Sequence, residues 1–131
     1  NLDLSFSGLK TSVLYTVRDI DNLTDQIKAD IAASFQQAVI EVLSKKIKKA
    51  VEISGRSEVI IAGGVAANKA LRSAIKDLEN SLGIKVFYPS LKYCGDNAAM
   101  IAFVGSLRSS DKIESQASYV RARWPLSELT K

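Results

Sequence analysis

The residues best suited to chemistry lie in two short stretches, each of which follows an apolar run. In the first, "VIIAGGVAAN" (residues 59–68), two glycines precede good helix formers, and Asn68 falls in the first turns of the predicted helix. Gly63 and Gly64 lack a Cβ, so a ligand can approach their backbone, and the free N–H groups of the next helix favour an anion such as phosphate. Asn68 offers a donor and an acceptor to a polar substrate. The alternative is ordinary strand-to-helix punctuation.

The second stretch is "YCGDNAAM", in which Asp96 stands where the N-cap of a helix belongs. Capping is one role for this carboxylate, and binding a metal ion near the first stretch is the other. A single carboxylate does not make a metal site, because such ions usually take three or more protein ligands. Any metal here would need ligands from a second domain. Cys94 is the only cysteine, which excludes an internal disulfide and favours a structural role for the thiol.

Two absences restrict the chemistry further. The chain has 131 residues and no histidine. The commonest catalytic base and the commonest transition-metal ligand are therefore missing from any site built by this chain alone. The chain also begins at Asn1, and its sole methionine is Met100, so we expect it to be a piece of something longer.

Composition indicates a globular chain. With 47% hydrophobic residues it can bury a core, and a net charge of +4 mildly favours an anionic partner such as nucleic acid or a nucleotide. The lysines at 45, 46, 48 and 49 are better explained as a solvated helix face than as a nucleic-acid patch. No stretch has membrane-spanning length and none resembles a signal peptide, so we expect a cytoplasmic protein without a membrane partner.

The elements that must position these residues follow an α/β order. Alternating apolar residues predict a strand at 2–6, and helical spacing predicts a helix over about 9–20, with Ser7 as its cap. One long helix runs from Thr24 to the residue before Gly55. A strand at 58–62, apolar enough to be covered on both faces of a parallel sheet, a helix at 66–82, a strand at 84–89 and a helix at 97–108 follow. Consecutive parallel strands would bring both candidate stretches to one edge of the sheet.

Several motifs together resemble one family. They are "LSFSGLKT", "DIAASFQQAV", "IIAGGVAANKALR", "KVFYPSLKYCGDNAAMIAFVG" and "RARWPL". In this order they resemble the universal tRNA threonylcarbamoyladenosine transferase family, bacterial TsaD, long labelled O-sialoglycoprotein endopeptidase or glycoprotease. The resemblance implies an actin-like, Hsp70-like and sugar-kinase-like (ribonuclease H-like) architecture of two α/β lobes around a nucleotide cleft. Residues 1–131 would then be a single partial domain, the later part of the second lobe.

The same resemblance implies a reaction and a site. The family transfers threonylcarbamoyl from its ATP-derived adenylate to adenosine 37 of tRNA, using iron or zinc held by a His-x-x-x-His pair in the first lobe and an aspartate in the second. Asp96 matches that aspartate, Asn68 matches a substrate-contacting asparagine, and Gly63 and Gly64 match the nucleotide-side glycine turn. Gly95 stands where the family commonly has threonine.

The resemblance also implies partners and limits. We expect tRNA and other threonylcarbamoyladenosine-biosynthesis proteins as partners, no catalysis by this chain alone, and self-association through exposed strand edges. Trp124, beside Arg121 and Arg123, either stacks on an RNA base or anchors the tail. The alternatives are a non-catalytic nucleotide- or partner-binding module, the metalloprotease of the older label, for which the chain lacks a base and a zinc ligand set, and a kinase of the same superfamily, against which "DNAAMIA" argues.

Overall fold

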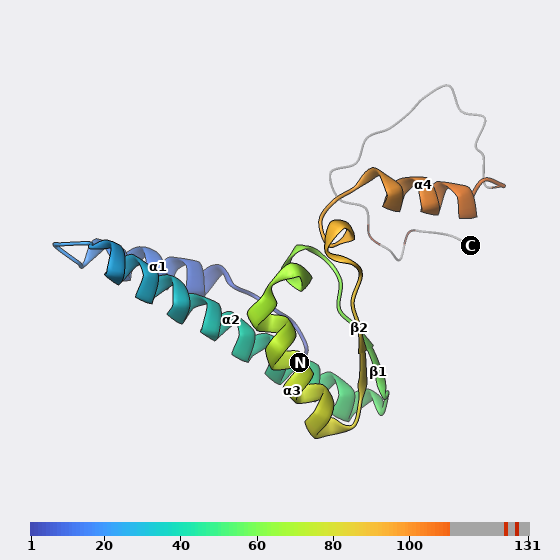
Figure 1. Cartoon of the computed structure of the whole chain (residues 1–131), viewed down its shortest axis with the longest axis horizontal. Coiled ribbons are helices and arrows are strands. Elements are labelled where there is room, and N and C mark those ends of the chain that lie inside the picture. The colour runs from blue at the N-terminus through green and yellow to red at the C-terminus, as the bar shows by residue number, and fades with distance from the viewer. Residues whose placement is uncertain (111–124, 126–127, 129–131) are drawn as a thin grey trace. The chain divides into compact units, whose positions relative to one another are not determined.

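The computed structural model describes residues 1–110, 125 and 128 of the chain. The chain divides into two compact units, Asn1–Asp96 and Asn97–Lys131. The first unit holds two long helices followed by a strand, a helix and a second strand, and the second contains one described helix (Figure 1). The predicted mixture of helices with a few strands is confirmed.

Two helices open the first unit. α1 spans Ser7–Arg18 and α2 spans Asp25–Ser54 (Figure 1). α2 begins where the sequence predicts, because the Thr24 hydroxyl accepts a hydrogen bond from the Ile27 amide at 3.3 Å. It ends at Gly55, whose φ of 63° is the left-handed conformation that terminates helices and that glycine adopts without strain. The predicted long helix is therefore confirmed at both ends.

A parallel strand-helix-strand unit follows. β1 spans Glu58–Ile60, α3 spans Lys69–Leu82 and β2 spans Lys85–Phe87. The strands pair in parallel, with Val59 opposite Val86. Because parallel strands point the same way, the loops that follow them leave from one edge of the sheet, as predicted.

The core of this unit lies between α2, α3 and the sheet. Ile40, Leu71 and Ile75 are its buried centre, and partly buried apolar side chains from both helices and both strands pack against it. α3 presents an apolar stripe toward α2 and the sheet and a polar face to solvent. Removal of this apolar surface from water is the main stabilising contribution in the unit.

The predicted strand at 2–6 is wrong. Residues 1–6 form no strand, and Leu2 and Leu4 remain 43% and 50% exposed. Alternation favours a strand only where a neighbouring strand supplies hydrogen bonds, and the sheet in the described residues consists of β1 and β2 alone. The predicted Ser7 cap is also wrong, because Ser7 is the first residue of α1 and no side chain caps that helix.

One face of the sheet is uncovered in the first unit. Ile60 on β1 is 77% exposed and Phe87 on β2 is 40% exposed, whereas Val59 and Val86, which point to the opposite face, are half-buried. The expectation that the strands are covered on both faces therefore fails within this unit. An apolar strand sequence indicates that both faces need to be buried, but it does not indicate which segment buries them.

The described helix of the second unit is α4, Ala98–Leu107. The Asn97 carboxamide accepts a hydrogen bond from the Met100 amide at 3.1 Å, so Asn97 is the N-cap. The helix-cap role considered for Asp96 is therefore wrong by one residue. Several large apolar side chains of α4 lie at the surface; Ile101, for example, is 76% exposed. Among the described residues, no helix combines the length and the apolar character needed to cross a membrane.

Glu79 joins α3 to β2. Its carboxylate accepts a hydrogen bond from the Lys76 ammonium at 2.6 Å and another from the Val86 amide at 2.9 Å. The hydrogen bond from Lys76 first, and then that from Val86, hold the pKa of Glu79 below its ordinary value of 4.5. A carboxylate with a lowered folded-state pKa stabilises the fold above its unfolded-state pKa.

We expect this stabilisation to disappear as the pH falls from 4.5 through the lower folded-state pKa of Glu79. Urea unfolding of the wild-type chain and of Glu79→Gln at a series of pH values measures the effect. The two should differ most at neutral pH and converge in acid. Glu52→Gln, at an exposed position on α2, is the matched control and should parallel the wild type throughout. A gap for Glu79→Gln that stays constant with pH would contradict the assignment.

Candidate site at the carboxyl ends of the parallel strands

The loop after β1 contains the glycine pair. Gly63 has φ 88° and ψ 174°, a conformation that side chains disfavour, so the backbone itself requires glycine there. Gly64 then opens a short 3₁₀ turn, η1, Gly64–Ala67, closed by a 3.0 Å hydrogen bond from the Ala66 amide to the Gly63 carbonyl. A Cβ built at either glycine would meet no atom within 4 Å. The backbone of the pair therefore faces open space.

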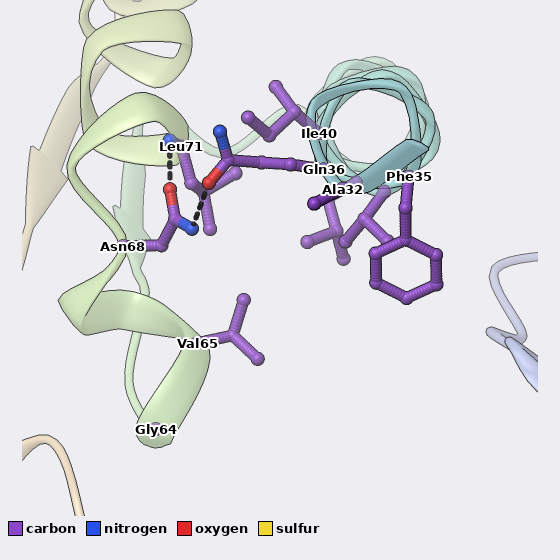
Figure 2. Close-up of a pocket in the computed structure, with 10 residues that line it drawn as sticks. Ala32, Phe35, Gln36, Ile40, Gly64, Val65, Asn68 and Leu71 are labelled. Carbon is purple, nitrogen blue, oxygen red and sulfur yellow. Dashed lines mark hydrogen bonds between the residues drawn. The ribbon is translucent and has the colours of Figure 1, made fainter. Parts of the chain in front are cut away.

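Asn68 is the N-cap of α3 and not a residue of its first turns. α3 begins at Lys69, because η1 occupies the positions predicted to be helical. The Asn68 Oδ1 accepts a hydrogen bond from the Leu71 amide at 2.9 Å, and Nδ2 donates one to Gln36 Oε1 at 2.9 Å (Figure 2). Both ends of the amide thus contact the protein. The second Nδ2 proton and the second Oδ1 lone pair are what Asn68 can offer a ligand.

A pocket of about 490 Å³ lies beside these residues. Gly64, Val65, Asn68 and Leu71 form one wall, and side chains of α2 form the other (Figure 2). The α2 wall consists of Ala32, Phe35, Gln36, Val39, Ile40 and Leu43. The lining is mostly apolar with two amides, a composition suited to a flat or apolar ligand group held by a few polar contacts. Two of the predicted site residues, Gly64 and Asn68, line this pocket, whereas Gly63 does not.

Sequence reasoning missed the contribution of α2 to this pocket. Gln36 precedes Asn68 by 32 positions, and nothing in its neighbourhood distinguishes it from other polar residues of the helix. The motif "DIAASFQQAV" contains it and contributes to the family resemblance. That motif is the only signal from which its place could have been suspected.

The loop after β2 leads to Asp96. Tyr88 and Pro89 are followed by a short 3₁₀ turn, η2, Leu91–Tyr93, and by Cys94, which is only 4% exposed. Burial raises the pKa of the Tyr88 phenol above its ordinary value of 10.0. Cys94 is a buried free thiol, consistent with the structural role predicted for it.

Asp96 is exposed at the end of this loop. Its carboxylate is therefore accessible, and Asn97 performs the capping that would otherwise have explained it. No group of three or more histidine, cysteine, aspartate or glutamate side chains in the described part of the chain could hold a metal. Asp96 thus fits a metal only as one ligand among others that this part of the chain does not supply. Trp124 and its neighbouring arginines lie outside the described residues.

Both loops and the elements around them fall within a single family match. The family model described as "TsaD: tRNA N6-adenosine threonylcarbamoyltransferase" matches residues 1–103. The chain belongs to the TsaD family. The match includes α1 to β2 and all four predicted site residues, Gly63, Gly64, Asn68 and Asp96. The TsaD family consists of tRNA-modifying transferases, so the chain is related to an enzyme family that acts on tRNA.

The two contacts of Asn68 make a prediction that separates its structural role from any ligand role. Asn68→Ala removes the cap of α3 and should lower the free energy of unfolding by about 1 kcal/mol. Asn68→Asp keeps an acceptor for the Leu71 amide and places a negative charge at a helix N-terminus. It loses the donor to Gln36, but the exposed Gln36 amide can turn and donate to the new carboxylate, so the variant should retain the stability of the wild type. Urea unfolding of the three chains measures this difference.

The same pair of variants tests whether Asn68 also contacts a ligand. A carboxylate at position 68 lacks the amide donor and repels phosphate, so Asn68→Asp should weaken binding of any phosphate-bearing ligand at this pocket while the fold stays intact. Equal affinity for wild type and Asn68→Asp would mean that Asn68 acts only as a cap.

Proposed function

We propose that this chain is the later part of the second lobe of a metal-dependent threonylcarbamoyl transferase that modifies adenosine 37 of tRNA. The observation that carries the proposal is the parallel unit β1-α3-β2, whose two loops leave one sheet edge within the stretch matched by TsaD. In open α/β sheets, ligands bind outside the carboxyl ends of the strands. The proposed fold is the second lobe of an actin-like, ribonuclease H-like architecture.

In this proposal Asp96 is the ligand that the second lobe contributes to an iron or zinc ion. Its exposed carboxylate at the end of the second loop supports the assignment. A His-x-x-x-His pair in a first lobe would supply the remaining protein ligands, since the chain contains no histidine. When bound, such an ion acts as a Lewis acid toward a carbonyl or phosphoryl oxygen. The role of Asp96 is to present a negatively charged oxygen ligand to it.

Gly63, Gly64 and Asn68 are proposed to contact the nucleotide side of the threonylcarbamoyl adenylate. The open space at the glycine pair lets a phosphate or ribose approach the backbone. The pocket of about 490 Å³ beside Gly64 and Asn68 offers an apolar wall with two amides. These residues therefore bind and orient the substrate, and no residue of this chain is assigned proton transfer.

The proposed partners are tRNA, other proteins of threonylcarbamoyladenosine biosynthesis and, for this chain on its own, a second copy. A net charge of +4 favours association with RNA, and a cytoplasmic location is proposed with it. Exposed Ile60 and Phe87 on a two-stranded sheet support self-association. Sedimentation as a clean monomer would contradict that part of the proposal.

Reconstitution tests the function. The chain alone should not modify tRNA, whereas the chain joined to a histidine-bearing first lobe of the TsaD family should transfer threonylcarbamoyl in the presence of the adenylate and the proposed partner proteins. Mass spectrometry of the digested tRNA detects the product, and the first lobe alone is the control. Robust transfer by the isolated chain, or none by the joined protein when both parts are folded, would overturn the proposal.

A second candidate is a non-catalytic module that binds a nucleotide. The pocket lined by α2, η1 and α3 favours it, because that pocket lies wholly within the first unit of this chain and needs no residue of a first lobe. Calorimetric titration of the isolated chain with an adenine nucleotide and with zinc distinguishes the two. Nucleotide binding that is unaffected by Asp96→Ala, together with failure of the reconstitution, would favour the module.

A further inference from the structure

Arg72 contacts both loops of the candidate site. It lies in the first turn of α3, where its Nε donates to the Ala66 carbonyl at 2.6 Å, and Nη2 donates to the Pro89 carbonyl at 3.2 Å. Ala66 belongs to the η1 turn after β1 and is 1% exposed, and Pro89 follows β2. A guanidinium is planar and rigid, so donors on one group that reach two segments fix the spacing between them.

Two further contacts hold the same guanidinium in place. Its Nη2 lies 3.5 Å from Cys94 Sγ, and its Cζ lies 4.7 Å from the centre of the Tyr88 ring. Cys94 is buried and precedes Asp96 by two residues. Arg72 therefore reaches from the turn after the glycine pair to the segment that leads into Asp96.

The partners of Arg72 indicate positioning. Within the described residues, the ion pairs are Lys28–Asp25, Lys45–Glu41 and Lys76–Glu79, so Arg72 takes part in none. Its half-buried charge is instead directed at backbone carbonyls of two loops. Hydrogen bonds from a charged donor are stronger than those between neutral groups, so each loop is firmly held.

We propose that Arg72 is a positioning residue that ties the loop after β1 to the loop after β2 and so sets the distance from Gly63 and Gly64 to Asp96. The link between the two loops follows directly from the hydrogen bonds of Arg72 to the Ala66 and Pro89 carbonyls. Its importance for Asp96 rests on the proposed function, in which Asp96 binds a metal. In this proposal Arg72 contacts neither the nucleotide nor the metal ion, and it acts through the two loops that it holds.

The lone thiol of Cys94 reports on the tie without any assumption about function. In the wild-type chain Cys94 should react slowly with a disulfide reagent, because it is buried beneath Arg72. Arg72→Ala and Arg72→Lys should both react at least about tenfold faster, since each loses charge-assisted hydrogen bonds that hold the loop. The lysine variant keeps a positive charge near the sulfur, so its faster reaction reflects access to the thiol.

Controls separate the tie from general destabilisation. Arg56→Ala, at an exposed arginine between α2 and β1, should react at the wild-type rate. Ethylguanidinium should restore slow reaction in Arg72→Ala, whereas ethylammonium should not, and a merely unfolded variant would respond to neither. Thiol reactivity within twofold of wild type in folded Arg72→Ala and Arg72→Lys would overturn the proposal.

The link to Asp96 is tested in the complete transferase. Arg72→Lys should lower kcat by about tenfold or more with a smaller change in KM for the adenylate, because the misplaced ligand affects the reacting centre more than substrate binding. An unchanged kcat alongside a fast-reacting Cys94 would overturn the part that concerns Asp96 and leave the tie between the loops. Inactivity of the wild-type protein itself would instead count against the proposed function.

Discussion

Ile75→Ala is expected to lower the free energy of unfolding of the first unit by about 2–5 kcal/mol. Ile75 lies in α3, has no exposed surface, and is the largest fully buried side chain among the described residues. Its removal leaves a cavity next to Ile40 and Leu71, which are the other two members of the buried centre. Because the total stability of a small domain is only about 5–15 kcal/mol, such a loss would remove a large fraction of it.

Ile53→Ala is the matched control for this experiment. Ile53 lies in the last turn of α2 and is 66% exposed, so the same change of side chain should alter the stability by less than about 0.5 kcal/mol. Urea unfolding monitored by circular dichroism measures both variants. Equal losses at the two positions would mean that the buried cluster does not hold the unit together.

The long helices were predictable because their signals are local. An apolar stripe without glycine or proline runs from Thr24 to Gly55, and those two residues then supply the cap and the left-handed end of α2. The strands β1 and β2 were predictable for a similar reason, since each is a short and largely apolar run that follows a glycine. Their parallel pairing was predictable because a helix lies between them in the sequence. The predicted start of α3 was wrong, because residues 66 and 67 belong to the 3₁₀ turn η1 and not to the α-helix.

The failures concern partners that lie far away in the sequence. The alternation in residues 2–6 is sound for a strand, yet no neighbouring strand pairs with it in the described residues. Asn68 has the right type for a ligand contact, while its actual partners are Gln36, 32 positions away, and an amide of its own helix. The role of Arg72 could not be predicted from the sequence, because its hydrogen-bond acceptors are main-chain carbonyls, which every residue has.

The same distinction applies to Asp96. Its place after the second parallel strand was predictable, and its carboxylate is exposed. The sequence could not show that Asp96 does not cap α4. Aspartate and asparagine are equally good caps, and only the backbone conformation decides between Asp96 and Asn97. The structure therefore removes the ordinary explanation for this carboxylate, and the metal interpretation becomes open to a direct test.

Under the proposed function, Asp96→Ala should abolish metal-dependent transfer in the two-lobe protein while leaving the fold intact. Changes to groups that merely support a metal ligand already cost about 10–100-fold, so loss of a direct ligand should lower activity by at least about a hundredfold. Bound iron or zinc should fall in parallel, as measured by atomic absorption. Because Asn97 caps α4, the free energy of unfolding should change by less than about 0.5 kcal/mol.

Asp77→Ala controls for the loss of one negative charge, because Asp77 is an exposed aspartate of α3 in the same unit. It should keep both the metal and the activity. If Asp96→Ala keeps its metal and its activity, the carboxylate is not a ligand. If it instead loses about 1 kcal/mol of stability with activity intact, Asp96 has the capping role that the position of Asn97 argues against. Loss of metal and of transfer at unchanged stability is the result that only a ligand explains.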